Sequence, residues 1–195
     1  AQIDRAEFGG RDFGGIELDA ELDSQRLSGR ISDRDEALRL LLSVSGTLTE
    51  REQRIGLSGS VFGFDLAALG VSPEPISGSF ALDASASAAG KGAYAARIAL
   101  DSIEIRNKHR TDRIRPTSVS LHTDSAATRA EAAFGDLSLT FSTPQSADSL
   151  IAALTRSART LAEQIDAQSI DMEQLKPALP DFALRVSAGP DNILN

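Results

Sequence analysis

Residues that could perform acid–base or metal chemistry are few and scattered in this sequence. The two histidines, His109 and His122, stand apart, and the chain contains no cysteine. A zinc site would therefore need both histidines together with carboxylates. We interpret the two side chains as ordinary surface histidines, and we expect neither a metal site nor a cofactor.

Three groups of carboxylates are the remaining candidates for chemistry. The run 33–36 is acidic enough for a calcium loop, but Arg34 interrupts it and the spacing is not that of an EF-hand. The pairs Asp101 with Glu104 and Asp19 with Glu21 could act as acid and base. Because these carboxylates alternate with apolar residues, we interpret them as residues on the solvent-exposed side of strands. Nucleotide-binding, P-loop, zinc-protease and nucleophile-elbow motifs are also missing, so the sequence predicts no catalytic residues and no enzyme.

Charge narrows the possible partners further. The 195 residues carry a formal net charge of −8, which argues against nucleic acid because phosphate binding needs a basic surface. Basic residues gather only at 108–115, which we interpret as a solvated loop, with contact to anionic headgroups as the alternative. No apolar run is long enough to span a membrane. The chain begins without Met, and we expect it to be a segment of a longer protein.

Apolar residues recur at every second position over most of the chain, as on half-buried strands. The clearest alternation runs over 38–48, followed by a turn and its antiparallel partner over 55–61. The phase then shifts near Val61, where a β-bulge would explain the change, and it slips again before Ile103. The pattern predicts a mainly β fold, in which eight to ten antiparallel strands form an elongated meander.

The periodicity changes to that of a helix after Thr143. We expect Thr143 to cap this helix, with Pro144 at its first position, and Asp171 to cap a short second helix. A single apolar stripe must lie against the apolar surface of the strands, because such a helix is not stable alone. The stripe consists of Leu150, Leu154, Leu161 and Ile165. We therefore expect one β-rich domain over 1–195 with a helical insertion over 143–180.

Several segments of the sequence resemble those of one protein family. These are Ser169–Leu175 followed by Leu179–Pro180, the strand-to-helix passage 137–150, and the segments 65–71 and 76–80. Together they are similar to stretches of the TamB-like proteins of Gram-negative envelopes, within the AsmA-like group. The resemblance covers about residues 57–195.

The resemblance implies a periplasmic segment of a long protein that is anchored in the inner membrane. It implies a folded-over β-sheet with an apolar trough for phospholipid acyl chains, and a role in lipid transport to the outer membrane. It also implies that the full-length protein acts together with a partner, a BamA-like outer-membrane barrel of the TamA type, in the assembly of outer-membrane proteins. The long helix departs from the family pattern because it would interrupt a continuous trough.

Two functions follow from these observations. The first is a non-enzymatic TamB-like segment whose sheet presents an apolar face to lipid. The alternative is a closed β-sandwich that acts as a binding or adhesion module of a cell-envelope protein. The residues expected to face lipid are Leu38, Leu40, Leu42, Val44, Leu48, Ile55, Leu57, Val61, Phe80 and Leu82.

Overall fold

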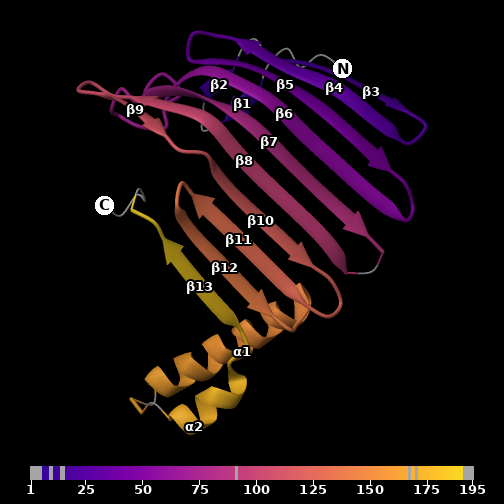
Figure 1. Ribbon diagram of the computed structural model, residues 1–195, viewed down its shortest axis with the longest axis vertical. Helices are drawn as coiled ribbons and strands as arrows, with labels where there is room; N and C mark the ends of the chain where they lie inside the picture. The colour runs from indigo at the N-terminus through magenta and orange to yellow at the C-terminus, as the bar shows by residue number, and fades with distance from the viewer. Residues whose placement is uncertain are drawn as a thin grey trace.

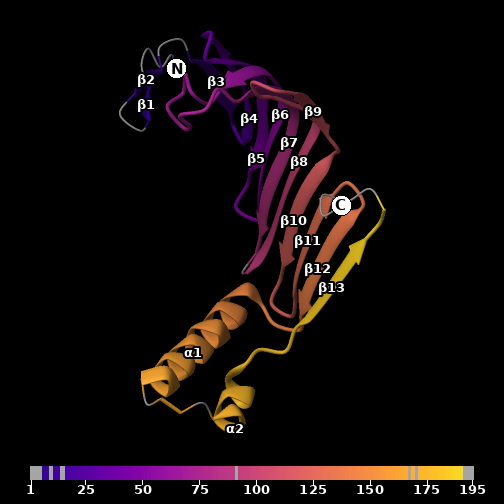
Figure 2. The same ribbon diagram turned by 90° about the vertical axis from the view of Figure 1, so that its left-hand side faces the viewer.

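The computed structural model describes residues 6–8, 11–13, 16–90, 92–166, 168–169 and 171–190. Most of them belong to one curved antiparallel sheet with a helical segment at one end (Figures 1 and 2). The fold is therefore mainly β, as the alternation predicts.

The main sheet has 11 strands, in the order β13-β12-β11-β10-β8-β7-β6-β5-β4-β3, with β9 paired to β8. Every pair in it is antiparallel. The strands are β3 (Glu17–Asp23), β4 (Arg26–Arg34), β5 (Leu38–Leu48), β6 (Glu52–Asp65), β7 (Ser77–Ala89), β8 (Ala93–Arg106), β9 (Thr111–Ile114), β10 (Thr117–Thr123), β11 (Thr128–Phe134), β12 (Leu137–Thr143) and β13 (Ala183–Ala188). A separate hairpin pairs β1 (Ala6–Phe8) with β2 (Arg11–Phe13). Strand β13 was not predicted from the sequence.

Both predicted phase shifts are register shifts in the sheet. One lies between Val61 and Phe64, where β6 changes its pairing with β5 and β7. The other lies opposite Ser79–Ala81, where β8 carries the extra residue Ser102 at φ 52°. At each place an added residue keeps apolar side chains on one face after the alternation has slipped by one.

Glycine is required at position 59 of β6. Its φ is 153°, and a Cβ there would lie 2.1 Å from the carbonyl oxygen of Leu41 on β5. Any other residue would push the two strands apart. Gly59 thus permits the close approach of β6 to the Leu41 carbonyl of β5.

The sheet is open and single-layered over the part of the chain that the structure describes. Its outer strands, β3 and β13, each pair on one side only. A closed β-sandwich, the architecture of the alternative function, needs two stacked sheets about 10 Å apart. That architecture is not the one observed.

The helical segment lies between β12 and β13, which pair with each other. It contains α1 (Ala147–Asp166), α2 (Met172–Leu175) and the 3₁₀ turn η1 (Lys176–Ala178), and it extends beyond the ends of the strands (Figure 2). Helix α1 packs against α2 and η1. The expectation that α1 lies along the sheet is therefore wrong.

The predicted cap of α1 is also misplaced. Thr143 ends β12, and its hydroxyl donates to the carbonyl oxygen of Asp181 at 2.6 Å. Ser146 caps the helix instead, because its Oγ accepts from the backbone N–H of Ser149 at 3.3 Å. The second predicted cap is confirmed, since Asp171 Oδ1 accepts from the Glu173 N–H at 2.9 Å.

Candidate functional site

One face of the sheet is apolar from edge to edge. In an antiparallel sheet, directly opposed residues share a face, so the register assigns each side chain to a side. One such row passes through Ile31 of β4, Leu42 of β5, Gly59 of β6, Leu82 of β7 and Leu100 of β8. Alternation along each strand then places every second residue on the same side as this row. We call this side the apolar face.

The ten residues that we expected to face lipid all lie on the apolar face. The structure brings them together from β5, β6 and β7 through the pairs Leu40 with Val61, Val44 with Leu57, and Val61 with Phe80. The full set is Leu38, Leu40, Leu42, Val44, Leu48, Ile55, Leu57, Val61, Phe80 and Leu82.

The apolar face also extends across strands whose residues were not included in that set. On β8 to β13 the same rows carry Tyr94, Ile98, Leu100, Val119, Leu121, Phe134, Leu137, Leu139, Phe141, Leu184 and Val186. Their alternation is visible in the sequence. What sequence reasoning missed was that β10 pairs directly with β8, which joins the two halves into one surface.

Much of the apolar face is open to solvent. Ile98 is 52% exposed, Val119 47% and Leu184 58%, although each lies in the interior of a strand. The whole chain exposes 13626 Å², whereas a compact monomer of its mass would expose about 8,900 Å². No second layer covers this face among the described residues, and large exposed apolar surfaces mark interaction sites.

The opposite face of the sheet is polar. On β5 it carries Ser43, Ser45 and Thr47, and on β3 it carries Asp19 and Glu21. These two carboxylates are therefore neighbours on the exposed side of an edge strand. We call this side the polar face.

The predicted stripe of α1 is largely exposed. Leu154 is 49% exposed and Ile165 58%, and Leu161 is exposed as well, while Leu150 is half-buried. The buried residues of the helix are Ala153, Ser157 and Gln164. The residues on this buried side are small or polar. Gln164 hydrogen-bonds the backbone of Asp171, a contact that an aliphatic sheet surface could not offer.

The candidate carboxylate pairs and the two histidines lie apart from one another in the part of the chain that the structure describes. Asp101 accepts from the N–H of Ser102 in the bulge, while Glu104 pairs with Arg106 at 2.9 Å and with Arg113 at 3.8 Å. His109 lies in the exposed turn before β9, and His122 lies on the polar face of β10. No group of three or more potential metal ligands occurs in the described part of the chain.

One carboxyl group has a clearly shifted pKa. Asp124, in the turn between β10 and β11, accepts hydrogen bonds from the N–H groups of Ala126 and Ala127 at 2.7 and 2.9 Å. These bonds favour the charged form and lower the pKa of Asp124, with a smaller contribution from nearby His122. The carboxylate of Asp124 therefore stabilises the turn between β10 and β11.

Helix α1 is too polar to cross a bilayer, and none of the helices among the described residues is both long and apolar enough to do so. Comparison with known protein families, with curated proteins and with solved structures finds no match to this chain.

Proposed function

We propose that this chain is a non-enzymatic segment of a TamB-like envelope protein whose apolar face holds phospholipid acyl chains. The observation that carries the proposal is the exposure of large aliphatic residues in the middle of strands, Ile98 and Val119 among them. Burying such side chains contributes about 25 cal/mol for each Å² removed from water. A guest with an apolar body is therefore favoured on this face.

Acyl chains suit the face better than one specific polar ligand does. Measured along the curved sheet, its ten serially paired strands span about 43 Å, because each of the nine spacings is about 4.8 Å. Along the rows most side chains are aliphatic, aromatic or small, and Ala84, Ala86 and Ala96 are among the small ones. Such a surface offers contact without directional hydrogen bonds, which is what a hydrocarbon chain can use.

The wider role belongs to the same proposal. In a longer periplasmic protein anchored in the inner membrane, stacked sheets of this kind would carry lipid toward the outer membrane. A TamA-type barrel is the partner we propose for the whole protein. The family assignment is supported by the sequence resemblance and by the open, one-sided sheet.

Lipid binding can be tested with two substitutions at adjacent positions on opposite faces. Val119→Glu places a charge on the apolar face, and Ser118→Glu places the same charge on the polar face of the same strand. The protein is purified from membranes in mild detergent, and bound lipid is measured by native mass spectrometry. We expect lipid on the wild type and on Ser118→Glu, and much less on Val119→Glu.

The matched pair makes the outcome decisive. Both positions lie in β10, so a general loss of folding would appear in the circular dichroism of both variants. Equal lipid occupancy in the two folded variants, or no lipid on the wild type, would contradict the proposal.

A further inference from the structure

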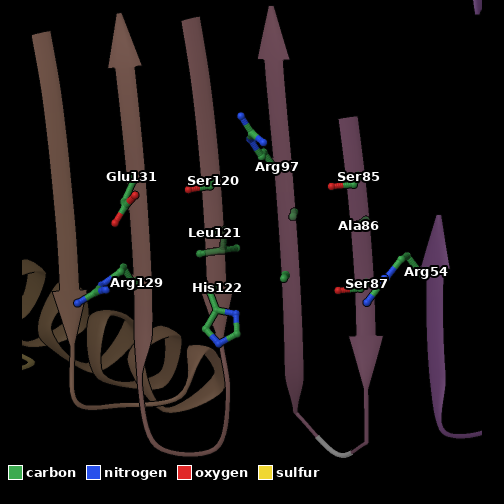
Figure 3. Close-up of a pocket in the computed structure, with 12 residues that line it drawn as sticks. Arg54, Ser85, Ala86, Ser87, Arg97, Ser120, Leu121, His122, Arg129 and Glu131 are labelled. Atoms are coloured by element: carbon green, nitrogen blue, oxygen red, sulfur yellow. The ribbon is translucent and has the colours of Figure 1, made fainter. Parts of the chain in front are cut away.

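The polar face contains a basic hollow that the lipid proposal does not use. Its volume is about 570 Å³, and it opens over β6, β7, β8, β10 and β11 (Figure 3). The charged residues in its lining are Arg54, Arg97, Arg129 and Glu131, with His122 beside them. Three cations against one anion is an unusual balance in a chain whose net charge is −8.

The register places two of the arginines at opposite corners of a small patch. Arg54 of β6 is opposite Ser87 of β7, and Ser87 is opposite Ala95 of β8. In the next row, Gly56 of β6 is opposite Ser85 of β7, which is opposite Arg97. The two serines thus lie between the arginines.

The remaining two corners of this patch are small. Gly56 and Ala95 leave space beside the serines. Ala95 lines the hollow, whereas Gly56 lines a neighbouring hollow that shares Arg54 and Ser85 with it. The backbones of Arg54 and Arg97 are about 12 Å apart, two strand spacings across and two residues along. Both side chains are long and flexible enough to reach a group placed over β7.

The arginines are free to turn toward such a group. Arg54 extends toward Ser87, and Arg97 leans toward β10 (Figure 3). Arg54 pairs with Glu52 at 2.7 Å, but both partners are exposed, and exposed pairs of this kind are weak. Arg97 is exposed on its strand. Glu52 is the carboxylate nearest to the patch, since it lies one row beyond Arg54 on the same face. Of the other carboxylates on this face, Asp83 lies one row from Ser85, and Glu131 lies two strands from Arg97.

We infer that this patch is a binding site for the phosphate group of a water-soluble phosphate ester. Arginine guanidinium groups match phosphate oxygens with two parallel hydrogen bonds, and serine hydroxyls can donate further ones. The site lies on the opposite side of the sheet from the apolar face. A lipid whose chains lie on that face cannot place its headgroup here, so the inference does not depend on lipid binding.

Calorimetric titration of the intact chain at low ionic strength tests the site. The probes are inorganic phosphate, glycerol 3-phosphate and, separately, vesicles containing phosphatidylglycerol. We expect saturable binding of both soluble phosphates. Arg54→Ser and Arg97→Ser should each weaken it by about tenfold or more, because each removes charged hydrogen bonds.

Two matched controls distinguish binding at this hollow from non-specific electrostatic binding to arginines elsewhere on the sheet. Arg185→Ser removes an arginine from the polar face of β13, outside the hollow, and should leave binding unchanged. Ala95→Leu fills the open corner without changing charge and should abolish binding, whereas Ala99→Leu, on the same face of β8, should not.

Three results would overturn the inference. The first is the absence of saturable binding to either soluble phosphate, including the case in which only vesicles bind. The second is an equal loss in Arg185→Ser and Arg97→Ser. The third is full binding by a folded Ala95→Leu variant.

Discussion

The hydroxyl oxygens of Thr123 and Thr128 lie 2.8 Å apart, directly opposite each other on β10 and β11. Thr128 donates to the carbonyl oxygen of Gln145 at 2.9 Å, and Thr123 accepts from the N–H of Ala147 at 3.0 Å. Thr123 must therefore donate to Thr128, so a single chain of hydrogen bonds ties the sheet to the start of α1. With Thr143 in the same row, three buried threonines end the apolar face and turn the chain outward.

Replacing Thr128 by Val should lower the free energy of unfolding by about 1–3 kcal/mol. The substitution keeps the side-chain shape but leaves the Gln145 carbonyl and the Thr123 hydroxyl without this partner. Urea denaturation followed by circular dichroism measures the change. Thr140→Val, on the polar face of β12, is the control and should change stability by less than about 0.5 kcal/mol. Equal losses in the two variants would contradict the role of the hydrogen-bond chain.

The strands could be predicted from the sequence because one face of the sheet must be apolar. Alternation around Leu42 and Leu82 therefore located strands, and the slips near Val61 and Ile103 located the register shifts. Strand β13 (Ala183–Ala188) was missed because it is only six residues long and comes shortly after a Pro-bearing turn. Its assignment depends on pairing with β12, which no local pattern reveals.

The position of α1 could not be predicted, for a related reason. Periodicity identifies an apolar stripe, but it does not say whether that stripe is covered. In this structure, hydrogen bonds at the two ends of α1 determine which side of the helix is covered. The row of threonines holds its start, and Gln164 holds its end. The threonine contacts join residues 17 and 24 positions apart, and Gln164 bonds to Asp171 across the turn that follows the helix. The spacing of Leu154 and Leu161 carries no signal of either contact.

Gln164 is expected to fix the return of the chain from α1. Its Nε2 donates to the Asp171 carbonyl at 3.1 Å, and its Oε1 accepts from the Asp171 N–H, also at 3.1 Å. Gln164→Ala removes both bonds from a buried site and should destabilise the helical segment by about 1–3 kcal/mol. Hydrogen exchange should accelerate in α1 and α2 and remain unchanged in β5 to β7. Gln164→Glu can still accept from the Asp171 N–H, but its buried carboxylate would face the Asp171 carbonyl oxygen, so the loss should be at least as large as in Gln164→Ala; a smaller loss would contradict this account.

Asp124 should make stability depend on acid pH. Its folded pKa is below the ordinary value of 3.8, so its contribution is complete above that value and is lost as the pH falls through the lowered pKa. In Asp124→Asn the amide oxygen can still accept from the turn, and this part of the pH dependence should disappear. Thermal midpoints measured between about pH 2 and pH 6 would show it. Asp83→Asn removes a carboxylate of β7 that makes no such turn, and an identical flattening in that variant would contradict the assignment.

Neighbouring residues on α1 should respond oppositely to a charge. Ala153 is 4% exposed, and Ala153→Asp would bury a carboxylate on the covered side of α1, which should cost several kcal/mol. Leu154 is about half exposed, so Leu154→Asp should change the free energy of unfolding by less than about 1 kcal/mol. Had the helix lain on the sheet with its leucine stripe inward, this order would be reversed. Thermal melts of the two variants therefore decide which side of α1 is covered in solution, and a larger loss in Leu154→Asp would contradict the arrangement described above.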